Sequence, residues 1–166
     1  GRGSQQNAGA RATEGDVLLF LHADSRLPSD SLPRIRDAVR GGAQSGFFAV
    51  RLESARPLLR LVGRMISLRS RVTGIATGDQ GLWVLRETFE RLGGFASLPL
   101  FEDVDLSRRL RSHGGSVALD SEVTTSARRW EQHGAWRTIV RMWVLRALYA
   151  LGVPAEHQSR YYGTAR

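Results

Sequence analysis

The stretch that decides the fold is an apolar run ending in a histidine and a carboxylate, Val17-Leu18-Leu19-Phe20-Leu21-His22-Ala23-Asp24. Five successive apolar residues without alternation are typical of a strand covered on both faces, as in the middle of a parallel sheet. Ligands of such sheets bind beyond the carboxyl ends of the strands. The run therefore predicts a buried strand that carries Asp24 to a place where a metal ion or a phosphate group binds.

Strands and helices alternate along the chain on either side of this run. We expect strands at 16–21, 45–53, 82–85, 116–119 and 123–125. We expect helices over 4–13, from Ser29 or Asp30 to Arg40, from Pro57 onward, and over 87–92, 102–113 and 132–151. The alternation predicts an α/β fold with a largely parallel sheet flanked by helices. Since no repeat or low-complexity linker divides the sequence, we expect one domain over 1–166.

The composition excludes several classes of protein. With 166 residues and a hydrophobic fraction of 42%, the chain is long and apolar enough to form a globular core. The chain contains no cysteine, which excludes disulfides and thiolate metal sites. No apolar run approaches the roughly 20 residues that a membrane span requires. We therefore expect a cytoplasmic protein, with peripheral attachment to the inner face of the membrane as an alternative.

The formal net charge of +8 first suggests a nucleic-acid partner. However, all 24 basic residues are arginines, and they are scattered along the chain instead of forming one block. No recognisable nucleic-acid-binding motif accompanies them, so we expect no nucleic-acid partner and keep this class as the weakest alternative. A small anionic substrate such as a nucleotide diphosphate fits the positive charge better.

A second acidic group opens the predicted helix over 102–113. Its acids, Glu102, Asp103 and Asp105, occupy the first turn and arginines the last, which is the distribution that the helix dipole favours. One interpretation is therefore a well-capped surface helix. The other is that Asp103 faces a cleft and accepts a proton as a general base, with Glu102 or Asp105 shaping its surroundings. The residues alone leave both interpretations open.

Several short motifs, in this order and at this spacing, resemble a family 2 glycosyltransferase of the GT-A fold. They are His22-Ala23-Asp24, Gly78-Asp79-Gln80-Gly81, Gly93-Gly94-Phe95, and Glu102-Asp103 followed by Leu106-Ser107-Arg108-Arg109-Leu110. The resemblance runs from Gly1 to about Arg160 and is strongest to a small bacterial subfamily often found beside radical-SAM genes. It implies a GT-A-like, Rossmann-like, mostly parallel sheet whose first strand, with the acid that contacts the nucleotide base, precedes Gly1.

The resemblance also implies catalytic and metal-binding roles. Asp103 matches the family's catalytic base, with Glu102 as its neighbour, and would deprotonate an acceptor hydroxyl in an inverting displacement. Asp24 matches the last acid of the Asp-x-Asp motif, which holds Mn²⁺ or Mg²⁺ against the diphosphate of a nucleotide-diphosphate sugar. His22 stands where the first acid would be, a departure from the family's pattern, and an imidazole favours softer ions than a carboxylate does. His22 could instead satisfy a backbone carbonyl.

Three further segments match substrate-binding parts of the family. Arg2, Gln6 and Asn7 resemble the segment near the nucleotide. Gly78, Asp79 and Gln80 resemble the loop beneath the donor sugar and acceptor, although Asp79 and Gln80 could be ordinary turn residues. Arg128-Arg129-Trp130 is similar to the end of a longer motif in processive relatives. Its leading glutamine is absent here, which implies one sugar transferred per cycle.

The predicted C-terminal amphipathic helix over 132–151 carries an apolar stripe bordered by arginines. The stripe comprises Trp136, Ile139, Val140, Trp143, Val144, Ala147, Leu148 and Leu151. Such a stripe packs on the core or on a partner, or it lies on a membrane surface through 136–151. The second option suits a lipid-linked acceptor. A catalytically degenerate GT-A-like domain that binds without turnover remains the alternative to an enzyme.

Overall fold

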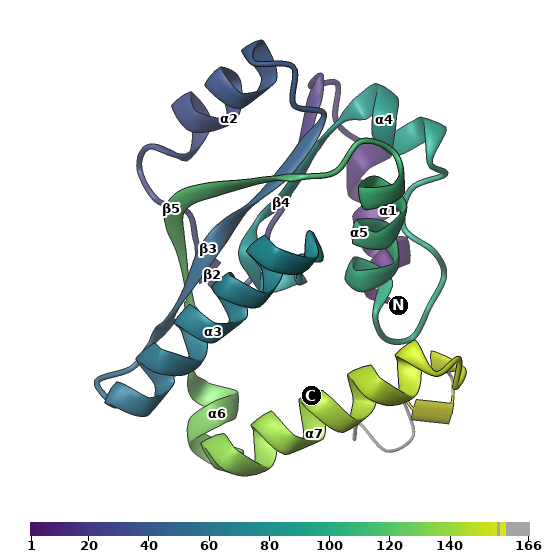
Figure 1. Cartoon of the computed structure of the whole chain (residues 1–166). Helices are drawn as coiled ribbons and strands as arrows, with labels where there is room; N and C mark the ends of the chain where they lie inside the picture. Colours follow the sequence, from purple (N-terminus) through teal and green to yellow (C-terminus); the bar gives the residue numbers. More distant parts are fainter. Residues whose placement is uncertain (156, 159–166) are drawn as a thin grey trace.

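The computed structural model describes residues 1–155 and 157–158, apart from the side chains of His133 and Ala150. This part of the chain is an α/β fold built on one mixed sheet (Figure 1). The strands lie in the order β1 (Val17–Phe20), β4 (Leu82–Leu85), β3 (Ser45–Glu53), β5 (Val117–Ser126) and β2 (Ser25–Arg26). The α/β class is therefore confirmed.

The sheet corrects the prediction of a mostly parallel arrangement. Within the part of the chain that the structure describes, only β3 and β5 pair parallel, whereas β1–β4, β3–β4 and β2–β5 pair antiparallel. Among the described strands, β1 lies at an edge and not in the middle. Its run of apolar residues is explained because both of its faces are covered. Leu18 and Phe20 are buried in the core on one face of the sheet, while Val17 and Leu19 pack against a second core cluster on the other face. Such a run indicates that both faces are covered, not which way the neighbouring strand runs.

Helices cover both faces of the sheet. On one face, Ile35 of α2 (Ser31–Arg40) packs with Phe48 and Trp83. On the other, α1 (Arg2–Arg11), α4 (Arg86–Arg91) and α5 (Glu102–Ser112) contribute to a cluster that contains Phe89 and Leu106. The longest helix, α3 (Pro57–Thr73), begins with proline at its first position, as predicted, and follows β3.

β5 joins two segments that the sequence analysis treats as separate strands, 116–119 and 123–125. Phe48 is paired with Leu119, but the next residue of β3, Ala49, is paired with Glu122. Asp120 and Ser121 form the resulting bulge. A bulge accommodates extra residues without ending the strand, so the polar interruption in the sequence is not a strand boundary.

The C-terminal helical region is also divided differently from the prediction. In place of one helix over 132–151, the structure has α6 (Arg128–His133) and α7 (Ala135–Ala150). Gly134 separates them with φ 81° and ψ 135°, a backbone conformation that favours glycine. Among the described residues, none of the helices combines the length and apolar character that crossing a membrane requires.

Candidate active site

The helix that carries Glu102 and Asp103 begins at a strained residue. Phe101 is the one described non-glycine residue with a left-handed backbone, at φ 68°. Such a conformation costs about 1–3 kcal/mol and is found preferentially at functional sites. Phe101 is buried and its ring lies 4.8 Å from that of Tyr149, centroid to centroid. The packing of α7 on this ring therefore supports the turn that positions the two acids.

The carboxylate of Asp103 is fixed by two backbone N–H groups. Gly78 donates to Oδ2 at 2.6 Å, and Val104 donates to Oδ1 at 2.7 Å. Burial raises the pKa of Asp103 from 3.8 to about 6, assisted by the charge of Glu102, while the two N–H donors act in the opposite direction. The side chain remains partly exposed. A carboxylate with a pKa near the working pH is suited to accept a proton.

The loop that donates to Asp103 is held by a buried glutamine. Gln80, in the 3₁₀ turn Gly78–Gln80, is 0% exposed. Its Oε1 accepts from Ser70 Oγ at 2.7 Å and from the backbone and hydroxyl of Thr77, and its Nε2 donates to the Phe48 carbonyl at 3.2 Å. These bonds engage both ends of the amide, so Gln80 ties the loop to α3 and β3.

His22 lies against the same loop. A Cβ atom placed on Gly78 would be 2.2 Å from His22 Nε2, so the imidazole packs directly over a glycine that has no side chain. His22 follows β1, and Gly78 donates to Asp103. The structure thus brings together three motif residues that are far apart in the sequence: His22, Gly78 and Asp103. We call them, with the residues that surround Asp103, the Asp103 cluster.

A further charged residue of this cluster, Arg69 in α3, was missed by the sequence analysis. Burial lowers its pKa, and the charges of Asp79 and Asp103 oppose that shift. The sequence does contain a pattern that points to Arg69, because position 69 continues the inward-facing helical series formed by Leu59, Val62 and Ile66. An arginine at a position where the helical period predicts an apolar residue is a candidate for a site.

The predicted metal ligands are not part of a preformed cage. Asp24 is exposed in the turn between β1 and β2, where its carbonyl accepts from Ser126 N at 3.1 Å. Within the described residues, no group of three or more His, Cys, Asp and Glu side chains is arranged to hold a metal ion. His22 and Asp24 offer one imidazole and one carboxylate; Mg²⁺ is usually held by one or two carboxylates with substrate phosphates, whereas imidazole suits softer ions. These two residues would therefore hold a divalent ion only together with oxygens of a bound diphosphate.

The predicted nucleotide segment lies on α1, beside the start of α5. Arg2 reaches within 4.0 Å of Glu102, whose carboxylate is buried. Asn7 forms two hydrogen bonds with the backbone of Phe95, at 2.8 and 2.9 Å, so its amide ties α1 to the Gly93-Gly94-Phe95 turn. Gln6 presents a buried Oε1 without a hydrogen-bond partner. The amide of Asn7 is therefore engaged in a structural contact, whereas Arg2 and Gln6 remain the candidates of this segment for contact with a ligand.

The Arg128-Arg129-Trp130 motif lies on α6, away from Asp103. Trp130 packs against the cluster that contains Leu59 and Val62, at the beginning of α3, whereas Arg69 is near that helix's end. Arg128 is exposed. Figure 1 likewise shows α6 and α5 in different parts of the molecule. The structure therefore does not bring this motif into the Asp103 cluster.

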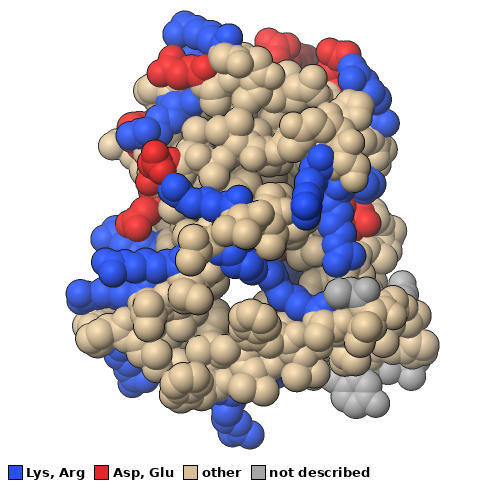
Figure 2. Space-filling model, in the orientation of Figure 1, with Lys and Arg blue, Asp and Glu red and all other residues tan. Residues whose placement is uncertain are grey.

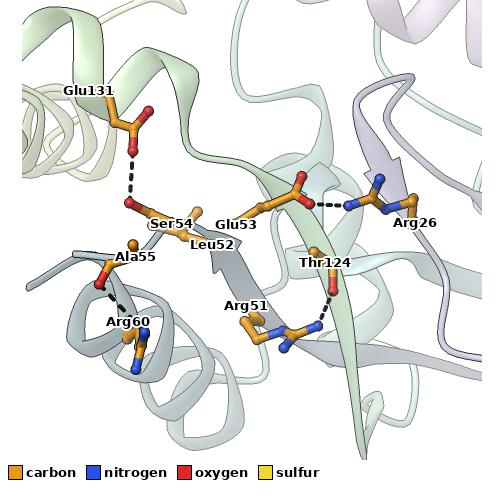
Figure 3. Close-up of a pocket in the computed structure, with 9 residues that line it drawn as sticks. All are labelled: Arg26, Arg51, Leu52, Glu53, Ser54, Ala55, Arg60, Thr124 and Glu131. Carbon is orange, nitrogen blue, oxygen red and sulfur yellow. Dashed lines mark hydrogen bonds and ion pairs between the residues drawn. The ribbon is translucent and has the colours of Figure 1, made fainter. Parts of the chain in front are cut away.

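A separate hollow of about 720 Å³ lies near the carboxyl ends of β3 and β5 (Figure 3). The polar groups that line it are bonded to one another: Arg26 with Glu53, Arg51 with Thr124 at 3.0 Å, Ser54 with Glu131 at 2.7 Å, and Arg60 with the Ala55 carbonyl at 3.4 Å. The lining contains none of the predicted site residues. Because its guanidinium groups are engaged, we assign it no ligand.

Comparison with known proteins gives one distant similarity. No protein-family model matches the chain. The chain is 25% identical over 154 residues to the beta-monoglucosyldiacylglycerol synthase of Synechocystis sp. (strain ATCC 27184 / PCC 6803 / Kazusa), in an alignment that covers 82% of this chain. It spans about a third of that relative's length, 32%. The similarity supports a relationship to glycosyltransferases in general.

Proposed function

We propose that the protein is an inverting glycosyltransferase that moves a sugar from a nucleotide-diphosphate sugar to an acceptor hydroxyl. The observation that carries the proposal is Asp103, a partly exposed carboxylate with a pKa of about 6 that two backbone N–H groups hold in place. The distant similarity to a glucosyl-lipid synthase supports the same class of reaction.

In the proposed reaction, Asp103 takes the proton of the acceptor hydroxyl as its oxygen attacks the anomeric carbon. The bond from that carbon to the diphosphate oxygen breaks, and the nucleoside diphosphate leaves with the electron pair. A single displacement inverts the anomeric configuration. Burial and, second to it, the charge of Glu102 keep the pKa of Asp103 raised, and Gly78 fixes the carboxylate's direction.

A divalent ion, Mn²⁺ or Mg²⁺, is part of the proposal. His22 and Asp24 would hold it, with oxygens of the donor's diphosphate as further ligands. When bound, the ion would offset the charge that develops on the departing diphosphate. Arg2 and Gln6 are proposed to contact the nucleotide.

We also propose that the acceptor is lipid-linked and that the protein works peripherally, at the inner face of the membrane. Most of the predicted stripe on α7 is exposed, with Trp136 at 69% and Trp143 at 71%, whereas Ile139 packs on the core. A groove of about 1020 Å³ is lined by Trp136, Val140, Val144 and Leu148 of the stripe. Leu145 of α7 lines this groove and also packs on Phe101 and Val104, which is next to Asp103 in the chain. We propose that an acceptor held in the groove reaches the base across this contact.

The test is nucleotide release from a panel of nucleotide-diphosphate sugars with a mixture of glycolipid and alcohol acceptors. Since general-base assistance is worth about 10²–10⁴-fold, Asp103→Asn should lose at least about a hundredfold in rate. The wild-type rate should also decline below about pH 6 as Asp103 becomes protonated. Asp105→Asn, in the same helical turn but paired with Arg109 at 2.6 Å, is the control.

Two results would contradict this proposal. Full activity of Asp103→Asn under single-turnover conditions would remove Asp103 as the base. Donor binding by the wild type without any nucleotide release would favour the degenerate binding domain instead.

A further inference from the structure

The turn that begins α5 is covered by one aromatic side chain of α7. The ring of Tyr149 packs on that of Phe101, with 4.8 Å between the centroids and an interplanar angle of 35°. On the same ring, the guanidinium carbon of Arg108 lies 4.8 Å from the centroid. Positions 101 and 108 share one face of the helix, about two turns apart. Tyr149 therefore joins α7 to the first part of α5 through two separate contacts.

Phe101 is the residue whose backbone sets the start of α5. Its carbonyl accepts the hydrogen bond that begins the helix, from Asp105 N at 2.9 Å, and its φ of 68° is left-handed. A phenylalanine does not favour that conformation by itself, because its Cβ is crowded there. An aromatic pair and a cation–π contact together stabilise by an amount of the same order as the strain of one such residue. The contacts of Tyr149 are thus large enough to hold the turn.

The apolar cluster on which Tyr149 packs includes both segments that hold the carboxylate of Asp103. Val104, whose N–H donates to Oδ1, is buried in this cluster. Ile75 packs against it and lies three residues before Gly78, whose N–H donates to Oδ2. Loosening the cluster would therefore release both donors, whereas the central strands of the sheet belong to other clusters.

The electrostatic surroundings of Tyr149 also place it near Asp103. Burial raises the pKa of Tyr149 above 10.0. The charges of Asp105 and, more weakly, Asp103 act in the same direction, and Arg108 acts in the opposite one. The phenol consequently stays protonated at neutral pH and cannot take the proton of an acceptor. Its effect on the site is exerted through packing.

We propose that Tyr149 is a positioning residue for Asp103: its ring holds Phe101 in the left-handed turn, and that turn directs the carboxylate to its two N–H donors. The catalytic consequence rests on the proposed function, whereas the contact itself needs no turnover. The helix α7, which carries the proposed acceptor groove, is on this view a structural part of the active site.

The test is amide hydrogen exchange measured by NMR, which requires neither donor nor acceptor. Tyr149→Leu keeps an apolar side chain but removes both ring contacts, and Tyr149→Phe keeps the ring. We expect the amides of Gly78 and Val104 to exchange about tenfold faster in Tyr149→Leu and at the wild-type rate in Tyr149→Phe. The amides of β3 are the internal reference, because global unfolding would accelerate exchange there as well.

Trp143→Leu is the matched control for exchange, since Trp143 is an aromatic residue of the same helix that is 71% exposed. Unchanged exchange at Gly78 and Val104 in Tyr149→Leu overturns the proposal. An equal acceleration in Tyr149→Phe also overturns it, because the effect would then belong to the hydroxyl. If circular dichroism shows that Tyr149→Leu is unfolded, Arg108→Gln decides: faster exchange at Val104 supports the proposal and an unchanged rate rejects it.

A second variant tests the role of the strained turn. Glycine adopts a left-handed backbone without support, so in a Phe101→Gly background the change Tyr149→Leu should accelerate exchange at Val104 less than it does in the wild type. An acceleration of the same size in both backgrounds would show that Tyr149 does not act through the turn, and it would overturn the proposal.

Transfer rates separate this inference from the proposed function. We expect Tyr149→Leu to lower kcat about tenfold with little change in the KM of the donor, and Tyr149→Phe to keep both. Full kcat in Tyr149→Leu would reject Tyr149 as a positioning residue and leave Asp103 as the base. If the wild type transfers no sugar, the proposed function fails, and exchange at Gly78 and Val104 alone decides this inference.

Discussion

The Asp103 carboxyl combines two opposing influences on its pKa. Burial and the charge of Glu102 raise the value to about 6, although two backbone N–H groups stabilise the charged form. Above pH 6 the folded protein therefore carries a partly buried anion that is less stable there than in water. Tolerating such a group is expected of a site that needs a proton acceptor near neutral pH.

The difference in unfolding free energy between Asp103→Asn and the wild type should depend on pH. The pKa of Asp103 in the folded protein lies above the ordinary value of 3.8. The unfolding free energy of the wild type therefore decreases as pH rises from about 4 to about 6. Two pKa units correspond to about 2.7 kcal/mol, and losing one accepted N–H bond offsets about 1 kcal/mol. We expect the variant to gain about 1–2 kcal/mol in unfolding free energy at pH 7 and nothing at pH 4. Denaturant unfolding at both pH values tests this.

Asp37→Asn is the control for that experiment, since Asp37 is an exposed residue of α2. An equal gain for Asp103→Asn at pH 4 and pH 7 would show that the pKa of Asp103 is not raised.

The contact between His22 and Gly78 should be visible in a double-mutant cycle. Gly78→Ala would place a Cβ 2.2 Å from His22 Nε2, a distance at which one of the two groups must move. We expect a loss of about 1–3 kcal/mol, and His22→Ala should relieve most of it in the double variant. Gly9→Ala, where a Cβ meets nothing within 4 Å, should be neutral or stabilising. Additive effects of His22→Ala and Gly78→Ala would contradict the contact.

At the scale of the elements, the polar loop Gly78–Gln80 connects three structural units. Gln80 bonds to Ser70 of α3 and Phe48 of β3, while Gly78 bonds to Asp103 of α5. A shift of α3 would therefore be transmitted to the carboxylate of Asp103. Gln80 acts on the site by positioning this loop, since its own amide is fully engaged with protein groups.

The break between α6 and α7 depends on Gly134. With φ 81° and ψ 135°, it adopts a conformation that costs other residues about 1–3 kcal/mol. An added Cβ would meet nothing within 4 Å, so the cost of Gly134→Ala is purely one of backbone conformation. We expect a destabilisation of that size in thermal or denaturant unfolding. A stabilised variant with increased helical signal would instead show that 128–150 prefers one continuous helix.

At the scale of the whole molecule, charge and apolar exposure are unevenly distributed. Figure 2 shows acidic side chains over the upper part of one face, and arginines bordering the lower layer to which α6 and α7 belong in Figure 1. Residues 127–155 contain five arginines and one glutamate. Exposed tryptophans beside arginines are typical of a helix that lies on an anionic bilayer.

We therefore expect the protein to float with liposomes that contain phosphatidylglycerol and not with phosphatidylcholine alone. The paired change Trp136→Ser and Trp143→Ser should remove most of the binding, and added salt should weaken it. The paired change Leu61→Ser and Met65→Ser is the matched control, because these α3 side chains are 54% and 55% exposed but lie outside the α7 surface. Equal loss in both pairs, or no flotation of the wild type, would reject the membrane surface.

The sequence by itself determined most of the elements and several motif residues. Local periodicity was sufficient for β1, β3, β4 and the helices α2, α3 and α5, because burial of one face or of both leaves a pattern in consecutive residues. The acids at the start of α5 were recognisable because they occupy the first turn of the helix, as the helix dipole favours. Whether Asp103 is a surface cap or a buried base was left open by that pattern.

Only the tertiary structure decided the direction of strand pairing, the bulge in β5 and the residues that surround Asp103. Pairing direction depends on how connections cross the sheet, and an apolar run reports only that its faces are covered. Arg69 and Gln80 reach the site through contacts that join α3, the 3₁₀ turn and β3. Such contacts depend on distances across the fold, and no local pattern of residue types encodes them.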